Sequence, residues 1–307
     1  MRSDFYFESN GAGKIHGCQW TPDGPVKAVV QIVHGIAEYV ERYDDFAQYL
    51  NQRGYLVVAE DHMGHGKSVQ EGGALGYFHG GWFTAVADTY QLLRTTKEVH
   101  PDVPYVLFGH SMGSFMTRTI LCKYPDSGIT AAVICGTGWQ PKAVLTAGIG
   151  IAQAVCKKNG EETPSKGLND FVFGTYNARV EHPRTPYDWL SRDAKQVDAY
   201  VAHPLCGFTP SAGLLRDMLI GIRFVEQGEN LKKMRKELPV LFIAGGDDPV
   251  GNYGKGIRQT AQAFRKAGMQ NVSERIYPLC RHEILNEINR GEIYEQTADW
   301  ITKQVEA

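Results

Sequence analysis

The segment of this sequence that most clearly suggests catalytic chemistry is Gly109-His110-Ser111-Met112-Gly113, in which a serine lies between two glycines. It follows the apolar run Tyr105 to Phe108 and precedes a helix-like segment from Ser114 to Tyr124. A sharp turn between a strand and a helix projects a serine hydroxyl, and glycines clear the crowded positions on either side. The start of the helix also directs amide groups and a positive dipole end toward a developing oxyanion. This context predicts that Ser111 is a nucleophile rather than a helix-capping serine.

A serine hydroxyl is a poor nucleophile by itself, so it needs a histidine base and an orienting carboxylate. A predicted strand from Pro239 to Ala244 leads into Gly245-Gly246-Asp247-Asp248, and a later strand from Asn271 to Tyr277 is followed by His282. Both groups then lie at the carboxyl ends of strands, where the sites of α/β proteins assemble. These positions predict His282 as the base and leave Asp247 and Asp248 open as the acid.

The oxyanion of such a reaction needs two amide donors, one from the residue after the nucleophile and one from a loop after an early strand. The segment Val33-His34-Gly35-Ile36 is a loop of this kind, since it follows a predicted strand from Ala28 to Val33. Its glycine permits a close approach of the backbone to a ligand. We therefore assign the amides of Ile36 and Met112 to the oxyanion hole.

Two other groups of reactive side chains have simpler interpretations. His62 and His65 lie three residues apart beside Asp61, a spacing that could hold a metal ion, but glycines surround them and no further ligand cluster accompanies them. A loop scaffold is favoured. Cys280 lies two residues before His282, but no glycine turn presents it as a nucleophile. We expect no metal and no cofactor.

The elements that must position these residues alternate between short apolar strands and longer helices, which is typical of a mostly parallel sheet flanked by helices. An antiparallel hairpin of Phe5 to Glu8 and Ile15 to Trp20 precedes them. The other strands predicted in the first half are Ala28 to Val33, Tyr55 to Glu60, Tyr105 to Phe108 and Ala131 to Cys135. The predicted helices are Glu41 to Arg53, Trp82 to Val99, Ser114 to Tyr124, Asn252 to Ala267 and Glu283 to Val305.

Residues 138–238 break this alternation and are rich in aromatic side chains. We predict that they form a helical cap inserted into a core domain made of residues 1–137 and 239–307. The apolar stretch from Ala143 to Cys156, together with the aromatic residues, predicts a lid over an acyl-binding cleft and is consistent with transient contact with a membrane surface. At about 14 residues, this stretch is shorter than the roughly 20 that a spanning helix needs.

Composition excludes several classes of protein. The balance of 32 Lys plus Arg against 34 Asp plus Glu provides no general basic surface, so a nucleic-acid partner is not expected. The first eight residues lack the apolar stretch of a signal peptide. The 6 cysteines include no Cys-x-x-Cys pair, which argues against a disulfide framework or a zinc ribbon. These features predict a globular cytoplasmic protein with buried thiols, and they leave its oligomeric state open.

At this point the sequence resembles the serine-dependent α/β-hydrolases, and within them the monoacylglycerol lipase and lysophospholipase-like group, with its serine aminopeptidase S33-type members. The resemblance implies an α/β-hydrolase fold with a helical cap insertion. The motifs that carry it occur in the family's order and are His34-Gly35-Ile36-Ala37-Glu38, Asp61-His62-Met63-Gly64-His65-Gly66-Lys67-Ser68, Gly109-His110-Ser111-Met112-Gly113, Gly245-Gly246-Asp247-Asp248-Pro249-Val250 and His282-Glu283.

The resemblance also implies roles for single residues. Ser111 would be the nucleophile, His282 the base, and Asp248 rather than Asp247 the acid. Glu38 and Arg42 stand where related lipases hold the alcohol end of a glyceride. Two departures bear on this alcohol specificity: Tyr39 stands where the family often has histidine, and Ser114 where a third glycine is common.

The predicted function is therefore that of a serine carboxylic-ester hydrolase that acts through an acyl-enzyme on a small-molecule acyl ester, such as a monoglyceride or a lysophospholipid. A serine at the elbow excludes the epoxide hydrolases and dehalogenases of this fold, which use aspartate there. Three enzyme alternatives keep the same triad: an aminopeptidase-like peptidase, a C–C bond hydrolase and a thioesterase. A non-catalytic binding protein is the alternative of another class.

Overall fold

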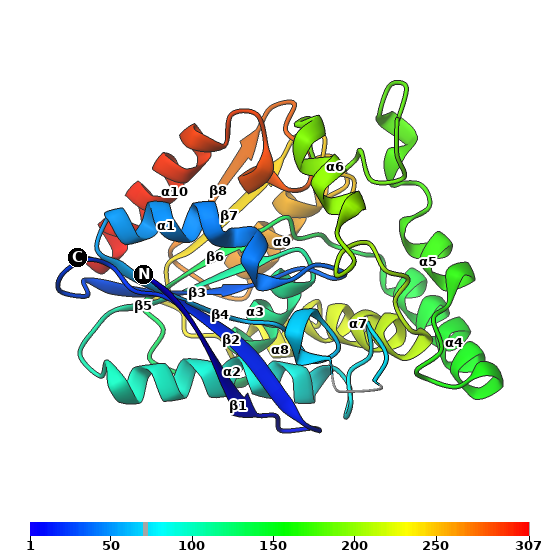
Figure 1. Ribbon diagram of the computed structural model, residues 1–307, viewed down its shortest axis with the longest axis horizontal. Coiled ribbons are helices and arrows are strands. Elements are labelled where there is room, and N and C mark those ends of the chain that lie inside the picture. The colour runs from blue at the N-terminus through cyan, green and yellow to red at the C-terminus, as the bar shows by residue number, and fades with distance from the viewer. Residues whose placement is uncertain (70–72, 307) are drawn as a thin grey trace.

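The computed structural model describes residues 1–69 and 73–306, and an eight-stranded sheet runs through its centre (Figure 1). The strand order is β1-β2-β4-β3-β5-β6-β7-β8. β1 and β2 form an antiparallel hairpin, β2 is antiparallel to β4, and the remaining pairs are parallel. The mostly parallel sheet is as predicted. The strands are β1 (Arg2–Glu8), β2 (Lys14–Trp20), β3 (Ala28–Val33), β4 (Tyr55–Glu60), β5 (Tyr105–His110), β6 (Ala131–Cys135), β7 (Val240–Gly245) and β8 (Val272–Tyr277).

Helices cover both faces of this sheet (Figure 1). On β3, Val29 and Val33 pack into one buried cluster and Val30 and Ile32 into the other, because successive side chains of a strand point to opposite faces. The first cluster includes side chains of α2 (Trp82–Val99), α3 (Met112–Lys123) and α9 (Lys255–Lys266). The second includes side chains of α1 (Asp44–Gln52) and α10 (Arg290–Val305). Both faces of the central strands are therefore buried.

Three predicted helices have different boundaries in the structure. The segment predicted as one helix from Glu41 is a 3₁₀ turn, Val40–Tyr43, followed by α1. Helix α9 begins only at Lys255, because Asn252 and Tyr253 have φ angles of 46° and 56°, which lie outside the right-handed helical region. Helix α3 begins two residues earlier than predicted, so that Ser111 is the only residue between strand and helix.

The prediction of one continuous helix from Glu283 to Val305 is wrong. The chain forms a 3₁₀ turn, Ile284–Asn286, and α10 begins only at Arg290. Between them, the buried carboxylate of Glu287 accepts hydrogen bonds from the Arg192 side chain and from the Arg281 amide. These tertiary contacts hold Glu287 in an extended backbone conformation, which a local pattern of apolar residues does not reveal.

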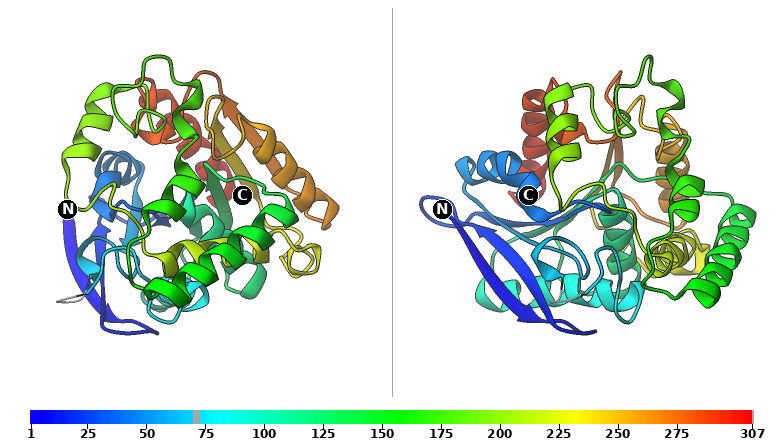
Figure 2. Two further views of the ribbon diagram at one scale, coloured as in Figure 1. Left: turned by 90° about the vertical axis from the view of Figure 1, so that its right-hand side faces the viewer. Right: turned by 45° about the vertical axis from the view of Figure 1, so that its right-hand side comes forward.

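The segment between β6 and β7 is helical, and it returns to the neighbouring strand of the sheet. Figure 2 shows α4 and α5 at the side of the molecule remote from the two termini. Helix α7 is different, because Leu214 and Leu215 belong to the same buried cluster as α2 and α3. The elements are α4 (Lys142–Asn159), α5 (Lys166–Phe173), a 3₁₀ turn (Tyr176–Arg179), α6 (Ala194–Ala202), α7 (Ala212–Val225) and α8 (Gly228–Leu231).

All 6 cysteines are buried and carry free thiols. Among residues 1–69 and 73–306, no helix is both long enough and apolar enough to cross a membrane.

Arg118 of α3 joins the start of the segment between β6 and β7 to the end of α7. Its buried guanidinium donates to the Thr137 hydroxyl and the Gly138 carbonyl, both at 3.1 Å, and to the Val225 carbonyl at 3.3 Å. Next to Val225, the carboxylate of Glu226 accepts the amide of Gln140 at 2.8 Å. Helix α3, which follows Ser111, therefore holds Gly138 and the end of α7 together.

We expect Glu226→Gln to remove a pH-dependent part of the stability. Burial raises the pKa of Glu226 from 4.5 to about 7, so the folded state binds this proton more tightly than the unfolded state does. This contribution favours the folded state at low pH and is lost as pH rises from about 4.5 to about 7. The melting temperature of the variant, relative to wild type, should therefore increase across this window and level off above it. A constant difference from pH 4 to 8 would contradict this expectation.

Candidate active site

Ser111 lies alone in a tight turn between β5 and α3. Its φ and ψ angles are 52° and -119°, a conformation that is strained for a residue with a side chain. The neighbouring glycines are required by close packing. A Cβ on Gly113 would lie 2.0 Å from the carbonyl oxygen of Val33, and one on Gly109 would lie 2.5 Å from that of Gly113. The strained turn therefore depends on backbone contacts that only glycine permits.

The predicted base and acid are in contact at the carboxyl ends of β7 and β8. His282 Nδ1 lies 3.0 Å from Asp248 Oδ1, and both side chains are buried. The same carboxylate oxygen accepts the amide of Val250 at 2.9 Å. The contact with Asp248 favours the tautomer of His282 that carries its proton on Nδ1, and it leaves Nε2 as the basic nitrogen. Asp247 is exposed, so the structure brings Asp248 and not Asp247 to the histidine.

The segment between β6 and β7 holds the backbone of His282 and its neighbour in place. The sequence did not indicate this contact. The amide of His282 donates to the carbonyl of Trp189 at 3.3 Å, and the amide of Glu283 donates to that of Leu190 at 2.7 Å. The Trp189 ring also lies beside the His282 ring, with 5.1 Å between their centroids. These contacts are mainly backbone hydrogen bonds, so the residue types of this segment do not predict them.

The amides assigned to the oxyanion hole are available. Among the residues that the structure describes, no group accepts a hydrogen bond from the amide of Ile36 or of Met112. The adjacent amide of Gly35 is occupied, since it donates to Glu38 Oε1 at 2.6 Å. Ser111, Ile36, Met112 and His282 line one cavity. This arrangement can present an ester carbonyl to a nucleophile, a base and two amide donors together.

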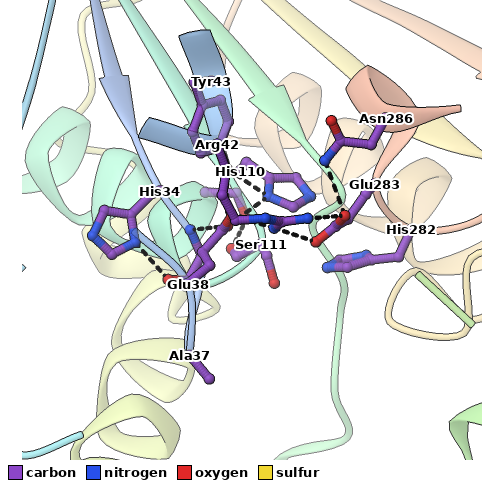
Figure 3. Close-up of polar contacts among 12 residues, drawn as sticks. His34, Ala37, Glu38, Arg42, Tyr43, His110, Ser111, His282, Glu283 and Asn286 are labelled. Carbon is purple, nitrogen blue, oxygen red and sulfur yellow. Dashed lines mark hydrogen bonds and ion pairs between the residues drawn. The ribbon is translucent and has the colours of Figure 1, made fainter. Parts of the chain in front are cut away.

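A network of buried charges lies directly behind the nucleophile (Figure 3). Glu38 accepts hydrogen bonds from Arg42 at 2.7 Å and from Tyr43 at 2.9 Å, and its Oε1 lies 3.2 Å from His110 Nδ1. Arg42 also donates two hydrogen bonds of 2.6 Å to Glu283. Although burial would raise the pKa of Glu38, His110 and Arg42 hold it well below its usual range. Likewise, Arg42 overcomes the effect of burial and lowers the pKa of Glu283.

The cavity has a volume of about 630 Å³ and is lined by apolar and by polar side chains. Glu38 and Glu283 are among its lining residues, whereas Arg42 is not. Its apolar side chains come mainly from the segment between β6 and β7, and they include Leu145, Phe171, Val172, Phe173, Met218, Leu219 and Ile222. A cavity with this lining can hold both an apolar chain and a small polar group.

The grouping most suited to a metal ion among the described residues is Asp4, His16 and Cys18, whose ligand atoms lie within 4.8 Å of one another. These groups already have partners. His16 contacts the buried Asp61 carboxylate at 2.8 Å, and Asp4 pairs with Lys67 at 3.1 Å. The group lies on the β1–β2 hairpin and does not line the cavity.

His62 and His65 support the loop by contacts with its backbone. His62 Nε2 lies 3.1 Å from the His34 carbonyl oxygen, and His65 Nδ1 lies 3.1 Å from that of Met63. These contacts are the ones expected of a loop scaffold.

Comparison with known proteins places this site in context. A family model described as serine aminopeptidase, S33, matches residues 24–289. The chain is 28% identical to a monoacylglycerol lipase of Mycolicibacterium smegmatis, over 99% of this chain and 98% of that protein. It is 36% identical to the monoglyceride lipase of Homo sapiens, over 91% and 87% of the two chains. The crystal structure of a thermostable carboxyl esterase from Bacillus coagulans, in complex with glycerol, is 29% identical and superposes with a TM-score of 0.92 over 99% of both chains.

We expect Asp248→Asn to lower the kcat for a p-nitrophenyl ester by about 10³ to 10⁴-fold, because an amide no longer fixes the imidazole tautomer or stabilises the imidazolium. Asp247→Asn, at the exposed neighbour, should leave kcat unchanged. Steady-state kinetics of both variants, with melting temperatures to verify folding, test this assignment. A large loss in the Asp247 variant and none in the Asp248 variant would reverse it.

Proposed function

Since the chain belongs to the serine aminopeptidase S33 family, and within it to the monoglyceride lipases and esterases of the α/β-hydrolase fold, we propose that it hydrolyses monoacylglycerols to a fatty acid and glycerol. The protein is a serine ester hydrolase. One observation carries the assignment of its site: Ser111, at the strained elbow, lines the same cavity as the buried His282, which is hydrogen-bonded to Asp248.

The proposed reaction begins when the Ser111 hydroxyl attacks the ester carbonyl carbon. His282 Nε2 takes the hydroxyl proton, and Asp248 stabilises the resulting imidazolium through Nδ1. The amides of Ile36 and Met112 stabilise the negative charge on the former carbonyl oxygen. His282 then gives its proton to the departing glycerol oxygen, which leaves an acyl-enzyme. Water attacks this ester in the same way, with His282 as base, and releases the acid.

The cavity suggests how the substrate is oriented. Burial of an acyl chain against the apolar lining from α4, α5 and α7 is favoured by about 0.8 kcal/mol per methylene. The glycerol hydroxyls would then face Glu38, which lines the same cavity as the nucleophile. A lysophospholipid would have to place a charged headgroup beside this buried carboxylate, so a neutral glyceride fits better.

The enzyme alternatives gain no support from the three relatives compared above, which are named as glyceride lipases and a carboxyl esterase. A non-catalytic binding role gains none either, because a strained serine beside a histidine–aspartate pair has an energetic cost that binding alone does not require. We further propose that residues 138–238 act as a cap on a core of residues 1–137 and 239–307. A reducing cytoplasm would suit the 6 free thiols.

The cap would also meet the surface on which glycerides reside. Val144, Ile151 and Phe171, on α4 and α5, are exposed by 49%, 47% and 56%. Exposed lysines of the same two helices accompany them, namely Lys142, Lys157, Lys158 and Lys166. Apolar side chains with basic neighbours are typical of segments that rest in a membrane interface.

We expect the variant Ile151→Ser/Lys157→Ser/Lys158→Ser to lose most of its binding to vesicles of neutral and anionic phospholipid in a flotation assay. Hydrolysis of monoacylglycerol presented in such vesicles should fall with it. Hydrolysis of water-soluble p-nitrophenyl acetate should change little, because these three side chains are exposed and do not line the cavity. Unchanged flotation of the variant would remove the proposed membrane contact.

Ser111→Ala should abolish hydrolysis of monoacylglycerols and of a p-nitrophenyl ester series from acetate to palmitate, and it should abolish labelling by a fluorophosphonate probe. Wild type should show an optimum chain length, set by the apolar side of the cavity. Labelling of wild type without hydrolysis of any ester would retain the nucleophile but contradict the proposed substrate. Peptide and C–C bond substrates would then be tested in the same way.

A further inference from the structure

We propose that Glu283, acting through Arg42, is a positioning residue that locks the loop of His282 to the oxyanion loop. This inference rests on the proposed function, because it concerns the same nucleophile and base. It also gives Arg42 a different role from the substrate contact that the sequence resemblance implies. The chain of contacts runs from His282 to its neighbour Glu283, then through Arg42 and Glu38 to Gly35, which is next to Ile36.

The contact between Arg42 and Glu283 has the geometry of a strong ion pair. Two guanidinium nitrogens each lie 2.6 Å from one carboxylate oxygen, and the side chains are 10% and 5% exposed. Paired, parallel hydrogen bonds of this kind fix orientation as well as distance. Asn286 also donates to Glu283 at 3.0 Å, so the carboxylate is held from its own loop as well. Glu283 is adjacent to His282, and its position therefore constrains the imidazole.

The same guanidinium reaches the oxyanion loop on its other side (Figure 3). Arg42 donates to Glu38 Oε2 at 2.7 Å, and Glu38 Oε1 accepts the amide of Gly35 at 2.6 Å. The next amide along the chain is that of Ile36, one of the two proposed oxyanion donors. A displacement of Arg42 would thus be passed on to this amide through a single side chain.

Arg42 is unavailable to a substrate in this arrangement. The hydrogen-bonding edge of its guanidinium faces Glu38 and Glu283, and the guanidinium carbon, Cζ, lies 4.8 Å from the centroid of the Tyr200 ring. Tyr200 in turn donates to the carbonyl of Ala37 at 2.9 Å, which is a further tie to the oxyanion loop. Arg42 is also not among the residues lining the cavity. To bind Arg42, a glycerol hydroxyl would therefore have to displace Glu38, Glu283 or the Tyr200 ring.

The topology of the sheet explains why such a link is needed. The oxyanion loop follows β3 and the His282 loop follows β8, and β5, β6 and β7 lie between these two strands. No ladder of backbone hydrogen bonds connects the two loops directly. A side-chain bridge across the carboxyl ends of the strands can hold the base and the oxyanion donors at one distance from Ser111.

The test uses Glu283→Gln, Arg42→Met and the double variant in the full chain. Glu283→Gln should lower kcat for p-nitrophenyl butyrate about 10 to 100-fold, with KM within about threefold, since misplacement of the reacting groups affects turnover rather than binding. The rate of fluorophosphonate labelling of Ser111 should fall in parallel. Glu283→Gln leaves Arg42 with one carboxylate instead of two, whereas Arg42→Met leaves both Glu38 and Glu283 without their cation. The melting temperature should therefore fall by about 5 to 10 °C, and more in Arg42→Met than in Glu283→Gln.

The double variant separates positioning from stability. With Glu283 and Arg42 both neutral, only Glu38 is left without its cation, so the double variant should regain part of the melting temperature that Arg42→Met loses. Its kcat and labelling rate should stay low because the bridge is absent. Glu161→Gln is the control for a carboxylate outside the site: Arg216 also pairs with two carboxylates, Glu161 and Asp217, none of the three residues lines the cavity, and Glu161 is 44% exposed. This control should retain the wild-type kcat. If Glu283→Gln fails to fold, Glu283→Asp keeps the charge, and its shorter side chain should still lower kcat.

Two outcomes would overturn the inference. In the first, Glu283→Gln loses thermal stability but keeps the wild-type kcat and labelling rate, which makes the pair purely structural. In the second, KM rises more than about tenfold at unchanged kcat, which makes the pair part of a substrate-binding site. Failure of wild type and of Glu161→Gln to hydrolyse any ester would instead contradict the proposed function. The labelling rates of the same variants would still decide the positioning role.

Discussion

The packing of α3 against the end of β3 is the constraint on which the rest of the site depends. Gly113 lies so close to the Val33 carbonyl that no side chain fits between them, and this contact forces the chain at Ser111 into its strained turn. The contact also sets the oxyanion donors, because Met112 begins α3 and Ile36 follows β3. A nucleophile and two amides are thus placed by backbone packing, before any polar side chain contributes. The packing of a large buried core offsets the energetic cost of this strain.

Around this turn, the protein concentrates ionised groups where water is excluded. Two buried carboxylates, Glu38 and Glu283, share Arg42, while Asp248 is paired with His282. Burial of charge is unfavourable unless each group is paired and hydrogen-bonded, so such a network adds little net stability. It tolerates few alternative arrangements, because any shift leaves a charge unpaired. That property suits a site whose reacting atoms must keep fixed distances, and it accounts for Arg42, a charged residue that does not itself line the cavity.

The segment between β6 and β7 contributes contacts to the site as well as residues to the cavity lining. Trp189 and Leu190 accept the amides of the His282 loop, Tyr200 packs on Arg42, and α7 shares the buried cluster of the core helices. These contacts make the insertion part of the framework that orients the base. They also explain why its helices carry two kinds of apolar residue. Some are buried against the core, whereas others, on α4 and α5, face the cavity or the solvent.

The sequence by itself determined the parallel sheet and the residues at the centre of the site. Short apolar runs that alternate with helix-like segments and a serine between glycines are local signals, and they identified Ser111, His282 and two candidate acids. These local signals did not determine which of Asp247 and Asp248 faces the histidine; the family resemblance indicated Asp248, and the fold buries this residue against His282. Local patterns also failed at Glu287, where tertiary contacts interrupt a predicted helix. The link from Glu283 to Arg42 joins residues 241 positions apart, and only the tertiary structure decided it, because such contacts depend on strand order and leave no local pattern.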